Sequence, residues 1–159
     1  MLESKVELIE AWQKADMRLS GGAGLKLMET RVTPVRDFKQ LLEATAESVN
    51  PRSTGHAWCL SGTMGCHGQG IYDPTKCGRC SHAIIDQSQS SLWQMIHLDN
   101  LRLTAVTDCG PAVQAKAKKA VEISTQVLTD LGVALPTAEQ AVSYELGQEL
   151  NQRYNRTEG

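Results

Sequence analysis

Four cysteines gather within 22 positions in the middle of the chain, with the spacing Cys59-x6-Cys66-x10-Cys77-x2-Cys80. The two-residue spacer between Cys77 and Cys80 lets both sulfurs reach one ion, and Gly78 relieves the tight turn between them. Four thiolates around Zn²⁺ form a closed tetrahedral site that leaves no position for a substrate. The sequence therefore predicts a structural zinc site whose ligands are Cys59, Cys66, Cys77 and Cys80.

Three histidines flank this cluster, and any one of them could replace a cysteine as a ligand: His56, His67 and His82. The alternative is that each is a solvent-facing or hydrogen-bonded loop residue. The thiols could also be free or redox-active, or could hold an iron–sulfur cluster, which four cysteines bind as well. Cys109 stands apart from the cluster, and we expect it to be a small buried residue before the Gly110-Pro111 turn.

No set of residues predicts catalysis. Cys66-His67 pairs a thiol with a base, but sequence neighbours seldom have the needed geometry, and no orienting acid is identifiable. The glycines between Gly62 and Gly70 resemble a phosphate-binding loop without its preceding strand and following helix. We therefore predict that the protein is not an enzyme, and no small-molecule substrate is evident.

Composition and charge indicate one ordinary globular domain. The chain has 159 residues and a net charge of −2, with 41% hydrophobic, 21% charged and only 4% aromatic residues. Few aromatics favour helices over sheets. No apolar run approaches the roughly 20 residues of a membrane span, and the first residues do not form a secretory signal. We expect a cytoplasmic protein without a membrane partner.

The charge also bears on nucleic-acid binding. A stand-alone DNA-binding protein usually has a basic footprint, which this chain lacks as a whole. Lys116, Lys118 and Lys119, with Arg102, could contact phosphates, although such a run is usually a solvated helix face.

Helical periodicity flanks the cysteine cluster on both sides. Ser4 and Glu7 form a capping-box pattern that predicts a helix over 4–19, ended by Ser20-Gly21-Gly22 and followed by a short amphipathic piece over 25–28. Further helices are predicted over 34–49, from about 88 to 106 (broadly buried), over 113–131 and from 137 to about 150. Trp58 and Trp93 are expected to pack inside.

The segment between these helical regions has no useful apolar periodicity, and at most a short ribbon is expected within 56–72. Ordering about 30 such residues costs about 1–2 kcal/mol each in backbone entropy, whereas structural zinc contributes on the order of 10–16 kcal/mol in small peptides. The predicted fold is mainly α, with helices flanking a central zinc-knuckle loop region that contains the four cysteines. Its parts are an N-terminal helical segment over 1–50, the knuckle over 51–86 and a C-terminal helical segment over 87–159, in one compact unit.

The stretch from His56-Ala57-Trp58-Cys59 through Gly65-Cys66-His67-Gly68 and Cys77-Gly78-Arg79-Cys80 to Asp86, followed by a Trp93-Gln94 helix, is similar to a known segment. It resembles the cysteine-rich C-terminal segment of large tyrosine-recombinase-type integrases of phage-like and integrative elements. The similarity covers roughly residues 55–132. The catalytic domain of that family is absent: no His here is followed by Arg three residues later, and Tyr72, Tyr144 and Tyr154 lack the needed surroundings.

The resemblance implies a non-catalytic zinc-binding module associated with DNA integration and recombination by a mobile element. Its partners would be DNA or recombinase subunits. Two alternatives remain open, a zinc-stabilised protein-interaction adaptor and a thiol-based redox or metal sensor. Steep weakening of binding with salt would separate DNA contact from an apolar helix interface.

Overall fold

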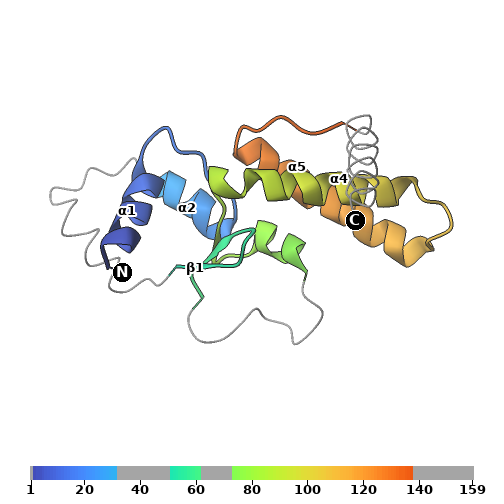
Figure 1. Cartoon of the computed structure of the whole chain (residues 1–159), viewed down its shortest axis with the longest axis horizontal. Helices are drawn as coiled ribbons and strands as arrows, with labels where there is room; N and C mark the ends of the chain where they lie inside the picture. The colour runs from blue at the N-terminus through green and yellow to red at the C-terminus, as the bar shows by residue number, and fades with distance from the viewer. Residues whose placement is uncertain (1, 32–50, 62–72, 138–159) are drawn as a thin grey trace, which may run out of the picture.

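The computed structural model describes residues 2–31, 51–61 and 73–137 (Figure 1). Helices α1 and α2 lie at one end of the molecule, and the long α4–α5 hairpin extends from the other side (Figure 1). A small sheet and a 3-10 segment lie between them. Among the described elements, helices hold far more residues than strands, so the expectation of a mainly α protein is confirmed.

The N-terminal region differs from the expected single helix. Helix α1 spans Leu2–Gln13, so Ser4 lies inside it and not at its cap, and the prediction of a helix over 4–19 was wrong at both ends. The chain then turns away so that Ser20 can form an isolated β-bridge with Ile85, with N–O distances of 2.8 and 2.9 Å. This tertiary pairing overrides helical periodicity, which extended to Leu19.

Helix α2 spans Gly22–Thr30, longer than the short amphipathic piece predicted there. Gly21 precedes it with φ +78°, and a side chain at that position would overlap the backbone of Ala83. A residue without a Cβ therefore lets the start of α2 approach the strand directly. The helices predicted over 34–49 and beyond residue 137 lie outside the described residues.

Three two-residue strands form an antiparallel sheet in the order β1-β2-β3: β1 (Arg52–Ser53), β2 (Trp58–Cys59) and β3 (Ala83–Ile84). The expectation of at most a short ribbon within 56–72 was therefore too narrow, because β1 and β3 fall outside that range. Strands of two residues show no alternation that a sequence pattern could reveal.

The C-terminal half follows its predicted order. A 3-10 helix, η1 (Pro74–Arg79), lies at the start of the described range 73–137. A second 3-10 helix, η2 (Gln87–Gln89), leads into α4 (Ser90–Ala105). Asp86 and Gln89 form a capping box before α4. Helix α5 (Pro111–Asp130) begins at a proline, two residues before the predicted start, and is followed by the predicted stop residue Gly132, which has φ +69°.

Two hydrophobic cores meet at the third strand. One lies around α4 and α5 and includes Trp93, which is fully buried as expected, together with Ile85 and Leu128. The other lies between α1, α2 and the sheet and includes Trp12 and Ile84. Successive residues of a strand point to opposite faces, so β3 and its neighbour Ile85 contribute to both cores.

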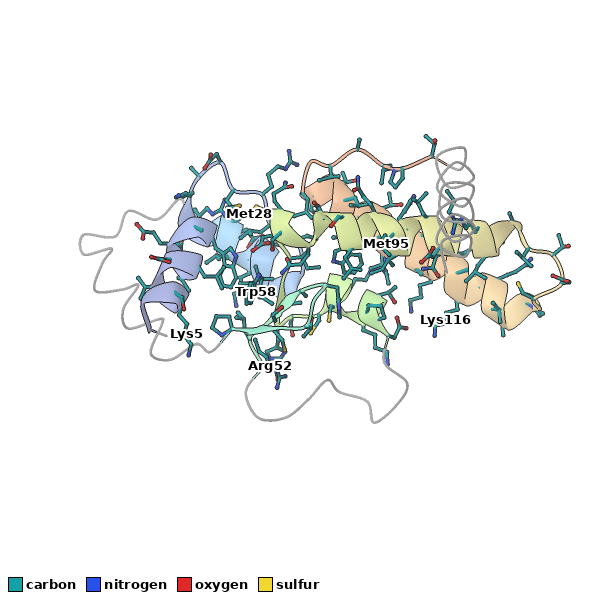
Figure 2. All side chains as sticks on the ribbon, in the orientation of Figure 1. Lys5, Met28, Arg52, Trp58, Met95 and Lys116 are labelled. Atoms are coloured by element: carbon teal, nitrogen blue, oxygen red, sulfur yellow. The ribbon has the colours of Figure 1, made fainter. Side chains whose placement is uncertain are left out.

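Trp58 packs as expected against the N-terminal core. Its ring lies edge-on to Trp12 with centroids 6.1 Å apart, and Figure 2 shows it between the sheet and the N-terminal helices. Both indole N–H groups donate to the buried carboxylate of Asp86, at 2.9 Å from Trp12 and 3.2 Å from Trp58. This carboxylate thereby links the two tryptophans to the start of α4.

The segment between α1 and α2 also contacts the end of α5. Arg18 Nε donates to the carbonyl of Asp130 at 2.8 Å, and Ser20 Oγ donates to its carboxylate at 2.8 Å. These contacts join residues about 110 positions apart in the sequence, so the described segments form one connected unit.

Two expectations about burial were wrong. In α4 only Trp93 and His97 are buried, because one face of the helix is covered by α5 and the opposite face, with Met95, is open (Figure 2). Cys109 is half-exposed rather than buried, and its thiol lies 3.3 Å from the Val106 carbonyl oxygen in the loop between α4 and α5. Among the described residues, no helix is long and apolar enough to cross a membrane.

Candidate metal centre

A buried histidine and a buried cysteine meet beside the small sheet. The Nε2 atom of His56 lies 3.1 Å from the Sγ atom of Cys77. Their exposed fractions are 2% and 9%. An imidazole nitrogen and a thiolate sulfur are both zinc ligands, so this pair is the chemical centre of the candidate site.

The β1–β2 turn directs His56 inward. Thr54 N–H donates to the Ala57 carbonyl at 2.9 Å, and Gly55 within the turn has φ +88°, a conformation that glycine adopts easily. The indole N–H of Trp93 donates to the His56 carbonyl at 2.7 Å, and the two rings lie edge to face 6.3 Å apart. The core of α4 and α5 therefore fixes the position of this histidine.

Burial lowers the pKa of His56, although a backbone hydrogen bond with Thr54 opposes this effect. The neutral imidazole is favoured as a result. A neutral ring is also the form that donates a lone pair to a metal ion.

The Cys77-Gly78-Arg79-Cys80 turn is held by η1. Asp73 caps this 3-10 helix by accepting from the Thr75 N–H at 3.1 Å. At its other end, Cys80 N–H donates to the Cys77 carbonyl at 3.2 Å, and Cys80 Sγ accepts from the His82 N–H at 3.5 Å. This backbone contact helps to fix the position of the Cys80 sulfur.

Cys59 lies on β2, in register with the third strand. It pairs with Ala83 across β2 and β3, and Ala83 belongs to the same core as Cys77. Paired residues of adjacent strands present their side chains on one face. Cys59 therefore shares a face of the sheet with Ala83, and Cys59, Cys77 and Cys80 form no disulfide among the described residues.

The predicted set of four ligands is only partly described. Cys66 lies outside the described residues, as does His67. His82 is exposed. Within the described ranges, no group of three or more His, Cys, Asp or Glu side chains is arranged to hold a metal ion.

The pair of His56 and Cys77 has nearly the separation that a shared ion requires. Bond lengths of about 2.0–2.1 Å to nitrogen and 2.3 Å to sulfur in a tetrahedral site put the two ligand atoms about 3.5 Å apart. The observed 3.1 Å differs from this by a few tenths of an ångström. Small side-chain rotations would therefore let both atoms bind one zinc ion.

Access to this pair is restricted. Both side chains are buried, with 2% and 9% of their surface exposed, and in the part of the chain that the structure describes neither lines the two cavities beside η1. A nucleophilic or redox-active thiol needs an approach for its substrate. The buried pair is better suited to a structural ligand role.

The histidine of this pair was not singled out as a ligand from the sequence. The sequence offers three flanking histidines as possible ligands, and no periodic pattern distinguishes His56 from the other two. The Gly55-His56 turn between two very short strands was the available signal.

Comparison with protein-family models, curated proteins and solved structures found no match. The resemblance of residues 55–132 to an integrase segment therefore stays a prediction from the sequence.

Proposed function

We propose that this protein is a non-enzymatic module stabilised by a structural zinc ion. The observation that supports the proposal best is the contact of 3.1 Å between the buried His56 Nε2 and Cys77 Sγ. Cys80 follows Cys77 at the end of η1, Cys59 lies on β2, and Cys66 stays a predicted ligand. Of these five residues, four would complete the tetrahedral site.

The donor chemistry favours zinc over the alternatives weighed from the sequence. Iron–sulfur clusters are usually held by cysteines alone, whereas a mixed nitrogen and sulfur set is typical of zinc. A redox or metal sensor requires exposed thiols of low pKa. Cys77 is buried in a hydrophobic core, which supports a permanent structural role.

The second part of the proposal concerns the partners of this module. Association with a mobile-element integrase, through DNA or recombinase subunits, rests on the resemblance alone. A protein-interaction adaptor is the alternative, and the exposed Met95 and Leu103 of α4 would suit such a surface.

Metal analysis tests the zinc site directly. The protein purified without added metal should contain one zinc per chain by elemental mass spectrometry. Cys77→Ser and His56→Gln should each lose most of the zinc, because each removes one of two ligands that already lie together. Cys109→Ser is the matched control: its thiol lies in the α4–α5 loop, and the variant should keep the metal.

A folded wild-type chain without metal would refute the proposal. So would a Cys77→Ser protein that retained zinc and an unchanged melting curve. Because a variant could fail to fold, cobalt(II) titration of the wild-type protein provides a second measurement. A thiolate-to-cobalt charge-transfer band should appear at one equivalent, and its absence would contradict thiolate ligation.

A further inference from the structure

A cavity of about 580 Å³ lies between η1 and α5, and neither His56 nor Cys77 lines it. Four basic side chains line it, two from each element: Lys76, Arg79, Lys116 and Lys119. Figure 2 shows Lys116 on the edge of α5 beside η1. Lys116 and Lys119 belong to the basic run that the sequence singled out, and the fold places Lys76 and Arg79 of η1 beside them.

The close packing of η1 on α5 creates this arrangement. Gly78 lies against α5, where a Cβ would overlap the Ile123 side chain and lie 3.2 Å from those of Trp93 and Val127. In a 3-10 helix, residues three apart are aligned on one side. Lys76 and Arg79 therefore both face along the line where η1 meets α5.

The α5 side has a matching pair. Lys116 and Lys119 are three residues apart, so they are neighbours on the helix surface. Between the two basic edges, the floor of the cavity includes Ala120 and Ile123, which are 4% and 5% exposed. The cavity thus combines an apolar floor with cationic walls.

The positive charges of the cavity are only partly balanced. Among the described residues, Asp73 is the one acidic side chain that lines it, and Lys116 Nζ lies 3.8 Å from its carboxylate. Asp73 also accepts hydrogen bonds from the Thr75 N–H and hydroxyl. Within the part of the chain that the structure describes, Lys76, Arg79 and Lys119 have no carboxylate at ion-pair distance.

We propose that this cavity binds a small phosphate-bearing ligand of the size of a nucleoside diphosphate. Its volume is within the usual range of about 300–1,000 Å³ for ligand sites. Arg and Lys donors suit phosphate oxygens, and the apolar floor would contact an attached organic group. The inference does not depend on a metal ion in the neighbouring site.

A small ligand fits the charge distribution better than a DNA duplex. Duplex binding needs an extended basic surface that contacts many phosphates. This chain has a net charge of −2 as a whole, and the four basic side chains of η1 and α5 named above line a single cavity.

Calorimetric titration of the full-length protein with ADP, inorganic pyrophosphate and adenosine tests the proposal. ADP and pyrophosphate should bind and compete with each other, whereas adenosine should bind much more weakly. Lys119→Gln and Arg79→Gln should each weaken ADP binding about tenfold or more, because each removes a charge-assisted hydrogen-bond donor. Lys118→Gln is the matched control, since Lys118 is exposed on the same helix but does not line the cavity.

Absence of heat with both phosphate ligands would overturn the proposal. It would also fail if Lys118→Gln weakened binding as much as Lys119→Gln, which would indicate unspecific attraction. A 20-base-pair DNA duplex that bound in place of ADP, and lost affinity in the Lys119 and Arg79 variants, would assign the cavity to nucleic acid instead. All four basic side chains are exposed, so the variants should keep the wild-type melting temperature.

Discussion

At the scale of single residues, two buried polar groups organise the sheet region. His56 joins Cys77 on one side, and on the other Asp86 accepts hydrogen bonds from Trp12, Trp58 and Ser88. A buried polar group without partners costs free energy, so each of these groups must be satisfied by specific neighbours. The residues that contact His56 and Asp86 must therefore provide matching hydrogen-bond partners.

Asp86→Asn should destabilise the protein by about 2–3 kcal/mol. The substitution replaces one carboxylate oxygen with an amide NH₂ group, which cannot accept the hydrogen bonds that this oxygen now receives. One oxygen serves the two tryptophans and the other serves Ser88, so either orientation of the amide loses contacts. Urea denaturation measures the change in the free energy of unfolding.

The control for this substitution is Asp99→Asn. Asp99 forms an exposed pair with Arg102 at 3.4 Å, and its side chain is 63% exposed. Its loss should cost less than about 0.5 kcal/mol. Equal effects of the two substitutions would show that the Asp86 hydrogen bonds do not stabilise the fold.

Residue-level prediction succeeded where chemistry depends on local spacing. The Cys77-x2-Cys80 spacing predicted a tight turn, and η1 forms one there, whereas the binding of both sulfurs to one ion stays a prediction. The role of His56 could not be predicted, because its approach to Cys77 depends on a hairpin turn and on the packing of Trp93. Such long-range contacts leave no local pattern.

At the scale of elements, the α4–α5 hairpin is the main scaffold. Its two helices pack along their length, and one polar contact lies inside the interface: His97 Nδ1 is 2.9 Å from Ser124 Oγ. Both residues are buried. The hairpin is therefore sensitive to the protonation of this histidine.

Acid should weaken the hairpin. Burial lowers the pKa of His97 in the folded protein below its ordinary value. The unfolded chain then binds a proton more readily, so folded stability is full above the unfolded pKa of about 6.5 and is lost as the pH falls towards the folded pKa. Burial also lowers the pKa of His56, so this histidine likewise makes the folded protein less stable as the pH falls.

His97→Gln should therefore reduce the slope of melting temperature against pH between about pH 5 and 7 without removing it. His82→Gln serves as the control, because that side chain is exposed. An unchanged slope in the His97 variant would mean that this histidine is not protonated differently in the folded and unfolded states.

Elements were predicted well where their signals were long and had clear ends. Helix α5 has twenty residues with Pro111 at its start and Gly132 after its end, and its predicted range was close. Strands β1 and β3 were missed, and only β2 falls within the short ribbon that was expected, because each strand has two residues. The end of α1 was misplaced because the Ser20–Ile85 bridge, a tertiary contact, competes with local helical preference.

At the scale of the whole molecule, β3 is the junction of the two cores. Ile84 packs with Trp12 in the N-terminal core, and Ile85 packs with Trp93 in the other. Both side chains are nearly inaccessible, with exposed fractions of 3% and 0%. Because Ile84 of β3 and the next residue, Ile85, belong to different cores, the two cores should unfold together.

Ile84→Ala and Ile85→Ala should each cost about 2–5 kcal/mol, the usual range for such truncations in a core. Each should shift one common transition, observed both by tryptophan fluorescence and by far-ultraviolet circular dichroism. Separate transitions by the two probes would show that the cores are independent domains.

The contacts of Arg18 and Ser20 with Asp130 have a consequence for biosynthesis. A ribosome adds about 5–20 residues per second, so the segment around Ser20 waits roughly 5–20 seconds before its partner at the end of α5 is made. Leu19 belongs to the N-terminal core, whose buried members extend only to Ile84, so that core can be completed before α5 is made. The contacts of Arg18 and Ser20 with Asp130 form last, and the N-terminal segment is joined to the end of α5 only after α5 has been synthesised.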